Sequence, residues 1–215
     1  MSSVVVFDLD KVLLGGDAST LFLRGRLSQS SARLLPLLLA SPVLLPGSAL
    51  PQTRPLAARV MTRLAVGGRS EDDVQAVAEA YGRALTRKPE AAVAEAIACV
   101  HRHLADGDLV VVATGCEEVL ARGFLRAIGL GDLDVVGSTG RLWPPRVQRA
   151  MGESKVKMLV ERGYPPPWKA AYSDSPSDLP LFAGSPRPVL VNNDEKAARQ
   201  VERTLGRPPE TVIWR

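Results

Sequence analysis

Two carboxylates stand close together near the start of the chain, directly after an apolar run. The run VVVF is followed by Asp8 and, after a single leucine, by Asp10, and apolar residues then resume. Side chains alternate along a strand, so an extended chain turns both carboxylates to the same face. Two like charges at this spacing repel each other unless a cation lies between them or one carboxyl is protonated. The pair therefore indicates a site that uses a metal ion, a proton, or both.

Three further polar clusters stand at the ends of apolar stretches or open a helix. Thr114 and Gly115 end DLVVVATG, Lys155 opens the helical segment SKVKMLVERG, and Asp174 and Asp178 lie in YSDSPSDLPLF. Carboxylate oxygens suit Mg²⁺, and a lysine or backbone N–H groups can hold phosphate oxygens. A carboxylate can also act as a nucleophile and pass through an aspartyl-phosphate. The combined set therefore favours phosphoryl transfer with Mg²⁺.

The elements that would position these groups alternate between strand and helix. Apolar stretches predict buried strands over 4–9, 108–115, 168–174 and 188–194, with short strands in LDVVGS and RLW and an edge strand in TVIW. Helices are expected over about 117–128, over SKVKMLVERG and over about 195–205, and the long stretch from about 19 to 104 is helical in pattern. This alternation predicts an α/β fold, an open and mostly parallel sheet with a helical subdomain inserted after the first strand. Ligands bind beyond the carboxyl ends of such strands, where the four clusters fall.

The composition excludes several classes of protein. The 215 residues suffice for one sizeable core with a small accessory domain, and the net charge of +4 comes from scattered arginines. A basic stripe interleaved with aromatic residues is missing, so we expect no nucleic acid partner. The two cysteines have no metal-binding spacing and the N-terminus lacks a basic leader, so we expect a cytoplasmic protein with free thiols. His101 and His103 are two residues apart on a predicted helix and face different directions, so we expect no metal site there.

One uncharged segment, residues 34–51, leaves two interpretations open. It reads LLPLLLASPVLLPGSALP, which is slightly shorter than the roughly 20 residues of a membrane span and is interrupted by three prolines. It can be a buried or partner-facing part of the helical subdomain. It can also contact a membrane interface peripherally, which would make the protein membrane-associated.

The order of the motifs resembles the haloacid dehalogenase (HAD) superfamily: DxD, then Thr after an apolar strand, then Lys, then DxxxD. The helical insertion between the first two motifs resembles subfamily IB, which includes phosphoserine phosphatase. AYSDSPSDLPLF and VLVNND resemble that subfamily's fourth motif and following strand, so the resemblance extends from about residue 4 to 194. It implies a Rossmann-like, mostly parallel sheet formed by 1–14 and 105–215, with an α-helical cap subdomain over 15–104.

The resemblance also implies a role for each residue of the carboxylate clusters. Asp8 is expected to be the nucleophile and Asp10 the general acid, which protonates the leaving oxygen and then activates water. Mg²⁺ is expected to bind the carboxylates of Asp8 and Asp174 and the backbone carbonyl of Asp10. Asp178 is expected to support the metal's waters or to hold Lys155. Because an alkoxide must be protonated whereas a halide leaves without a proton, the second aspartate favours phosphate over halide.

The Thr114 hydroxyl and the Gly115 N–H are expected to bind phosphate oxygens. Lys155 is expected to neutralise charge beside these oxygens. Asp17 stands where phosphoserine enzymes carry a glutamate that binds the substrate's ammonium. It can take that role, or it can cap the first helix of the insertion.

The chain departs from the family pattern beside its DxD motif and in its fourth motif. The usual DxDGT or DxDST is DLDKV here, and Lys11 can either fix an anionic substrate or point to solvent or the cap. The fourth motif, SDSPSD, differs from GDGxND at Ser173, Ser175 and Ser177, which weakens the case for phosphoserine.

The sequence therefore predicts a Mg²⁺-dependent phosphomonoester hydrolase that acts through an aspartyl-phosphate. Its expected substrate is a small phosphorylated metabolite such as phosphoserine or a related amino alcohol phosphate. One alternative is a phospholipid head-group phosphatase, because 34–51 resembles the apolar cap segment of bacterial phosphatidylglycerophosphate phosphatases, which share YSDS. Another is a catalytically impaired binding module, which DLDKV would suit, and a third is a purely structural or partner-binding role.

Overall fold

The computed structural model of the chain describes residues 3–18, 21, 71–86, 91–141, 146–148 and 150–214. The segment 34–51 lies outside these residues, and so does most of the predicted cap. In the part of the chain that is described, no helix is long and apolar enough to cross a membrane.

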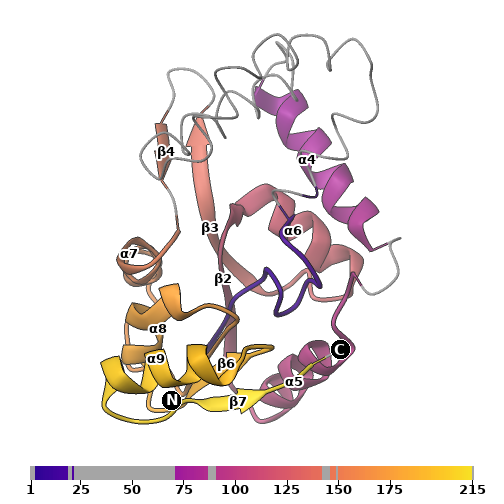
Figure 1. Ribbon diagram of the computed structural model, residues 1–215. Helices are drawn as coiled ribbons and strands as arrows, with labels where there is room; N and C mark the ends of the chain where they lie inside the picture. The colour runs from indigo at the N-terminus through magenta and orange to yellow at the C-terminus, as the bar shows by residue number, and fades with distance from the viewer. Residues whose placement is uncertain are drawn as a thin grey trace, which may run out of the picture.

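A seven-stranded sheet forms the centre of the molecule (Figure 1). Its order is β4-β3-β2-β1-β5-β6-β7, and every neighbouring pair is parallel except β3 and β4. The strands are β1 (Val4–Phe7), β2 (Leu109–Glu117), β3 (Asp134–Arg141), β4 (Arg146–Gln148), β5 (Ala170–Ser173), β6 (Pro188–Val191) and β7 (Glu210–Val212). The predicted Rossmann-like, mostly parallel sheet is confirmed.

Side chains alternate between the two faces of this sheet, and each face is covered by helices (Figure 1). Val5 and Phe7 belong to the core on one face, which includes side chains of α5 (Ala94–Ala105) and α6 (Glu118–Ala127). Val6 belongs to the core on the other face, with side chains of α7 (Glu153–Glu161), α8 (Leu179–Ala183) and α9 (Glu195–Leu205). A short 3₁₀ turn, η1 (Pro176–Asp178), precedes α8. The strands are apolar on both sides because both faces are buried.

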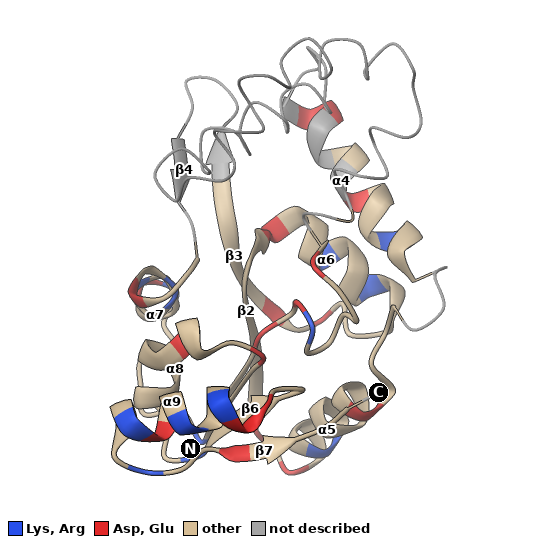
Figure 2. Ribbon diagram, viewed as in Figure 1, with Lys and Arg blue, Asp and Glu red and all other residues tan. Residues whose placement is uncertain are grey.

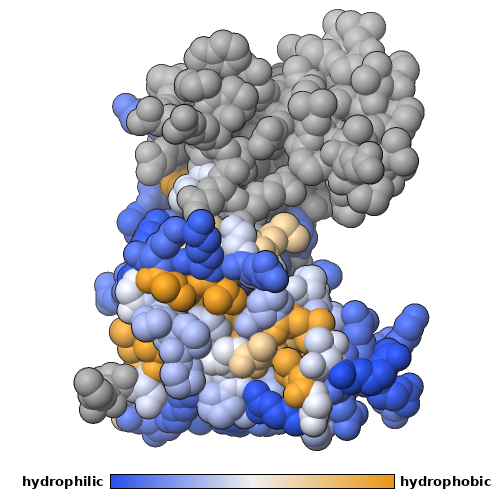
Figure 3. All heavy atoms as spheres, turned by 90° about the vertical axis from the view of Figure 1, so that its left-hand side faces the viewer, coloured by the Kyte–Doolittle hydropathy of each residue, from blue (hydrophilic) through white to orange (hydrophobic). Residues whose placement is uncertain are grey.

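The helical face with α7, α8 and α9 carries several separate hydrophobic patches between hydrophilic residues (Figure 3). Val160 of α7, for example, is exposed. Isolated exposed apolar residues are ordinary on soluble domains.

β1 occupies the topological switch point of the sheet. β1 pairs with β2 on one side and with β5 on the other. From β1 the strand order continues to β2 and β3 in one direction and to β5 and β6 in the other, so the loops beyond these strands diverge at the carboxyl end of β1. Open α/β sheets bind their ligands at this place, because loops from both sides diverge there and leave a crevice. The carboxyl ends of β1, β2 and β5 are also where the sequence places its polar clusters.

The boundary predicted for the helical insertion needs a correction. Residues up to 104 were assigned to the cap, yet α5 packs on the sheet, where Cys99 and Val100 share one core cluster with Val5 and Val110. α5 therefore belongs with the sheet. The division of the rest of the chain into a core and a cap stays a prediction.

α4 (Glu71–Leu85) lies along α6, and two glycines allow the close approach. A Cβ on Gly82 would lie 2.5 Å from the carbonyl oxygen of Leu120, and one on Gly123 would lie 2.5 Å from that of Glu79. These distances leave no room for a methyl group on either helix, so the backbones of α4 and α6 meet directly.

Candidate active site

Asp8 is the first residue beyond β1 and is held by its backbone and its side chain. Its N–H donates to the carbonyl of Tyr172 at 2.8 Å, which continues the pairing of β1 with β5. Its Oδ1 accepts the N–H of Leu9 at 2.8 Å, and the residue is 7% exposed. The carboxylate is therefore fixed at the switch point and largely withdrawn from water.

Lys155, in the first turn of α7, brings a buried ammonium to this carboxylate. Its Nζ lies 3.4 Å from Oδ1 of Asp8 and 2.7 Å from Oδ2 of Asp178, and the residue is 2% exposed. Ser173 donates to the same Asp178 oxygen at 2.7 Å. Asp178 thus holds Lys155, one of the two roles expected for it, and Lys155 can balance charge beside Asp8.

Asp10 is anchored by the loop that follows β1. Its Oδ1 accepts the N–H of Ala18 at 2.8 Å, eight residues along the chain. Burial raises the pKa of Asp10 to about 6; the Ala18 hydrogen bond opposes this shift and the nearby Asp17 adds to it. A carboxyl with such a pKa can hold and release a proton near neutrality, as a general acid and base must.

Burial also raises the pKa of the other carboxylates expected to bind metal. For Asp8 the ammonium of Lys155 opposes the shift, whereas Asp178 and Asp10 add to it. For Asp174 the main opposing charge is Lys11. The pKa of Lys155 is raised even though burial opposes its charge, because Asp8 and Asp178 attract it. Burial is therefore the main cause of the raised carboxyl pKa values, and the two lysines oppose it.

Thr114 and Gly115 lie in the last part of β2 (Leu109–Glu117), beside Asp8. Phe7 pairs with Val112, so Thr114 stands one residue further along the sheet than Asp8. The Thr114 hydroxyl is buried and accepts the N–H of Cys116 at 3.0 Å, while Gly115 faces solvent. The two residues predicted to bind phosphate are thus placed beside the predicted nucleophile.

Ser138, in the middle of β3, connects Gly115 to the loop before α7. Its hydroxyl donates to the Gly115 carbonyl at 2.7 Å and accepts the N–H of Ala150 at 3.1 Å. A Cβ on Gly115 would lie 3.3 Å from Cγ of Met151. The sequence analysis missed Ser138; its one signal was its place at the end of a short apolar run, like the other clusters.

Asp174 follows β5 and is positioned from two sides. Its backbone carbonyl accepts a hydrogen bond from the side chain of Asn193, and its Oδ2 lies 3.4 Å from Nζ of Lys11. Neither partner was predicted: Asn193 was noted only within VLVNND, and Lys11 was expected to point to substrate, solvent or the cap. Acidic and basic residues therefore gather along the loop after β1 (Figure 2).

Asp17 is exposed at the start of a helical turn. Its carbonyl accepts the N–H of Leu21 at 2.9 Å, and its charge contributes to the raised pKa of Asp10. It therefore lies close enough to Asp10 to influence the site, and its role toward substrate stays a prediction.

The residues at this edge of the sheet fit a divalent cation. Within the described chain, four carboxylates gather near two ammonium groups. Burial raises the pKa of three of the carboxyl groups, and neighbouring carboxylates add to the shifts; the six residues are Asp8, Asp10, Asp174, Asp178, Lys11 and Lys155. Hard oxygen donors of this kind suit Mg²⁺. The carboxylates of Asp8 and Asp174 and the carbonyl of Asp10 would hold it.

A second group of titratable side chains lies at the other end of the sheet. Oxygen and nitrogen atoms of His103, Asp106 and Asp108 lie within 4.8 Å of one another. However, Nδ1 of His103 bonds Asp108 at 2.8 Å and Nε2 bonds the Tyr172 hydroxyl at 2.9 Å, while Lys169 donates to Asp108 at 2.6 Å. Both ring nitrogens are thus engaged, and the arrangement is a hydrogen-bonded network between α5 and the starts of β2 and β5.

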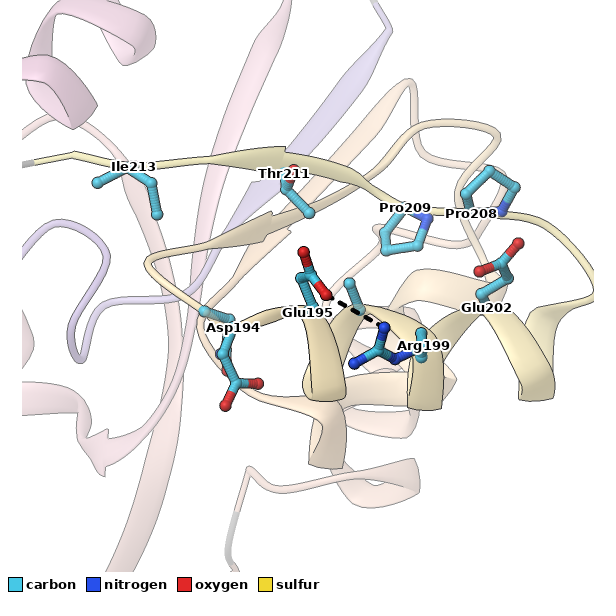
Figure 4. A pocket seen from close by; sticks show the side chains of 10 residues that line it. Asp194, Glu195, Arg199, Glu202, Pro208, Pro209, Thr211 and Ile213 are labelled. Atoms are coloured by element: carbon cyan, nitrogen blue, oxygen red, sulfur yellow. Dashed lines mark hydrogen bonds and ion pairs between the residues drawn. The ribbon is translucent and has the colours of Figure 1, made fainter.

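A groove of about 470 Å³ runs between α9 and the edge strand β7 (Figure 4). An ion pair between Glu195 and Arg199 lies on its α9 side, and Pro208, Pro209 and Ile213 line the opposite side. None of the predicted catalytic, phosphate-binding or metal-binding residues lines it. Asn193, whose side chain hydrogen-bonds the Asp174 carbonyl, does line it, so the groove borders the candidate active site without containing its predicted residues.

A model of the haloacid dehalogenase-like hydrolase family matches residues 5–183. The chain belongs to this family. The match spans the strands and loops that carry Asp8, Thr114, Lys155 and Asp174, and it confirms the resemblance drawn from the motifs and the prediction of a hydrolase. A search of the curated proteins found no match.

Solved structures share the fold of this HAD-family chain at low sequence identity. A protein of unknown function from Bordetella pertussis Tohama I has a TM-score of 0.71 at 22% identity, with 99% of both chains covered. A phosphoserine phosphatase, solved as an analogue of its phospho-aspartyl intermediate, has a TM-score of 0.56 at 13% identity, covering 99% of this chain and 93% of the other. Cytosolic 5'-nucleotidase IIIB bound to cytidine has a TM-score of 0.56 at 10% identity, covering 98% and 80%.

Proposed function

We propose that this HAD-family protein is a Mg²⁺-dependent phosphomonoester hydrolase that forms an aspartyl-phosphate on Asp8. The observation that carries the proposal is the buried ammonium of Lys155, held by Asp178 at 2.7 Å and facing Asp8 at 3.4 Å. A buried cation beside a fixed carboxylate is what a nucleophile attacking a phosphate dianion requires, because both reactants carry negative charge.

The reaction begins with attack by a carboxylate oxygen of Asp8 on phosphorus. Asp10, which has a raised pKa and is oriented by the Ala18 N–H, gives its proton to the leaving oxygen as the P–O bond breaks. Asp10 then takes a proton from water, and the resulting hydroxide attacks phosphorus, which releases inorganic phosphate and restores the Asp8 carboxylate. When bound, Mg²⁺ neutralises charge on the phosphate and on Asp8.

The phosphate oxygens are assigned to the end of β2. The Thr114 hydroxyl and the Gly115 N–H are placed one strand away from Asp8, and Ser138 fixes the Gly115 turn. Lys155 supplies the compensating charge on the opposite side, from α7.

For the substrate, we propose a small phosphorylated metabolite such as phosphoserine or a related amino alcohol phosphate, with exposed Asp17 as the partner of its ammonium. A phospholipid head group is the second candidate, supported by the uncharged segment 34–51 and by the YSDS sequence of the fourth motif. We place the protein in the cytoplasm, which agrees with the free thiols of Cys99 and Cys116, and peripheral membrane contact belongs with the lipid candidate.

Phosphate release with Mg²⁺ tests the proposal. The panel is a chromogenic aryl phosphate, phosphoserine, phosphoethanolamine, and phosphatidylglycerophosphate in vesicles. Asp8→Asn should abolish release from every substrate, whereas Asp132→Asn, on an exposed loop before β3, should not change it. The preferred substrate decides between the metabolite and lipid candidates. Turnover that survives in Asp8→Asn would contradict the mechanism, and a folded protein inactive on the whole panel would favour the binding module.

A further inference from the structure

Lys11 has a backbone conformation that directs its side chain to the candidate metal site. Its φ is +56°, in the left-handed region that residues other than glycine seldom adopt. Its N–H donates to the Gly16 carbonyl at 3.2 Å, and its own carbonyl accepts from the Asn192 side chain at 3.5 Å. The loop therefore maintains an uncommon backbone conformation at Lys11. This lysine stands two residues after Leu9 and three residues after Asp8.

The ammonium of Lys11 contacts a carboxylate that the proposed function assigns to Mg²⁺. Nζ lies 3.4 Å from Oδ2 of Asp174, whose side chain is 15% exposed, whereas the Lys11 side chain is 63% exposed. Asp174 is fixed from behind by Asn193. The exposed lysine is thus the partner that can move, and the carboxylate stays in place.

The other lysine of the site has a different environment. Lys155 is buried, and its Nζ lies 2.7 Å from the Asp178 carboxylate. Lys155 therefore has a partner of its own besides Asp8, whereas the ion pair recorded for Lys11 is with Asp174. A metal ion bound to Asp174 and the ammonium on the same carboxylate would repel each other.

We propose that Lys11 is a built-in competitor of Mg²⁺ for Asp174. In the metal-free protein its ammonium balances the Asp174 carboxylate, and Mg²⁺ has to displace it, so Lys11 raises the Mg²⁺ concentration at which the site fills. This inference rests on the proposed function for the identity of the metal site. It explains why the small residue of the usual family pattern is a lysine here without requiring that the enzyme be impaired.

Calorimetric titration of the full chain with Mg²⁺, at constant ionic strength and without substrate, measures the effect directly. Lys11→Gln should lower the Kd for Mg²⁺ about two- to fivefold, the size expected when one exposed ion pair no longer competes. Lys11→Gly removes the same ammonium and suits the positive φ, so it should tighten binding equally and should fold. The Kd of Lys11→Arg for Mg²⁺ should stay close to that of the unaltered chain. The difference in Kd between Lys11→Gln and the unaltered chain should shrink at high salt.

Lys157→Gln is the matched control. Lys157 is on the same helix as Lys155, its side chain is 72% exposed, and its Nζ is 3.9 Å from Glu161, so the substitution makes the same change in net charge away from the site. Its Kd should be unchanged. Equal or weaker Mg²⁺ binding in Lys11→Gln and Lys11→Gly would overturn the inference and leave the proposed function standing. If the unaltered chain binds no Mg²⁺, the inference and the metal dependence of the proposed function both fail.

Discussion

The carboxyl groups of the site differ in their partners, and the difference divides the chemical work between them. Burial raises the pKa of Asp8 to about 7, and the buried ammonium of Lys155 opposes this shift, which favours the charged form that a nucleophile needs. Asp10 accepts a backbone hydrogen bond, and burial raises its pKa to about 6, which suits a residue that must alternate between acid and base. The proposed function therefore gives the two aspartates of this motif separate tasks.

Asp10→Asn tests this division, because an amide cannot give up or take a proton in Asp10's place. Turnover of an alkyl phosphate should fall by about 10²–10⁴-fold. With an aryl phosphate, whose leaving oxygen needs no proton, the first step should survive and the second should be slow. Rapid-quench kinetics should therefore show a burst of phenol equal to the enzyme concentration. Absence of a burst with the aryl phosphate would contradict separate roles for Asp8 and Asp10.

Single residues also show how far the sequence could predict this site. The closeness of Asp8 and Thr114 could be expected because parallel strands place their carboxyl ends at one edge, whereas the place of Lys155 beside Asp8 was implied by the family resemblance. The contact of Lys11 with Asp174 depends on a positive φ that the residue type does not reveal. The hydroxyls of Ser138 and Ser173 have partners on other loops, so their roles required the packed structure.

At the scale of elements, the last helix and every strand except β4 were predictable. A short strand was expected in RLW, residues 141–143, but of these only Arg141 is described, and it ends β3. The predicted helix over 195–205 is α9, which begins after the Asp194 cap and ends at Gly206 with φ +70°. β2 runs two residues further than predicted because a register shift lies between Thr114 and Glu117. α5 was assigned to the insertion, since an amphipathic helix shows that it has a partner but not which partner. Its packing on the sheet could be learned only from the structure.

The contact between α4 and α6 predicts the effect of a small substitution. Gly123→Ala improves helix propensity by about 1 kcal/mol, but its methyl group would lie 2.5 Å from the Glu79 carbonyl oxygen. We expect a net loss of about 1–3 kcal/mol in the free energy of unfolding, because the two backbones must separate. Urea unfolding measures it. A gain in stability would show that the helices do not meet closely in solution.

Across the whole molecule, one network of charged and aromatic side chains secures the end of the sheet opposite the site. Asp108 accepts hydrogen bonds from Lys169 and pairs with His103, which bonds the hydroxyl of Tyr172. The Tyr172 ring stacks on Phe7 with centroids 4.2 Å apart; Phe7 immediately precedes Asp8, and Tyr172 precedes Ser173, the last residue of β5. The network therefore joins α5 to the two strands that carry the candidate metal ligands.

The network should make stability depend on pH through Asp108. Burial opposes ionisation, but the hydrogen bonds from Lys169 and His103 outweigh it, so the pKa of Asp108 lies below its usual value of about 3.9. The stabilisation is complete above that unfolded-state value and is lost as pH falls through the lower folded-state pKa. Asp108→Asn should cost about 1.5–3 kcal/mol at neutral pH and progressively less below about pH 4.

Urea unfolding of both chains at several pH values, with Asp132→Asn as the exposed control, checks this prediction. The control should show no comparable loss of stability at any pH. A cost in Asp108→Asn that stays constant into acid would mean that ionisation of Asp108 does not contribute to folding.

The most direct test of the whole account is to find the phosphoryl group on Asp8. The unaltered chain is mixed with an aryl phosphate and Mg²⁺, quenched in acid within one turnover, and digested for mass spectrometry. The account predicts one phosphoryl group on the peptide that contains Asp8, more of it in Asp10→Asn, and none in Asp8→Asn. Phosphate release with an unmodified Asp8 at every time point, or a phosphoryl group on another residue, would contradict it.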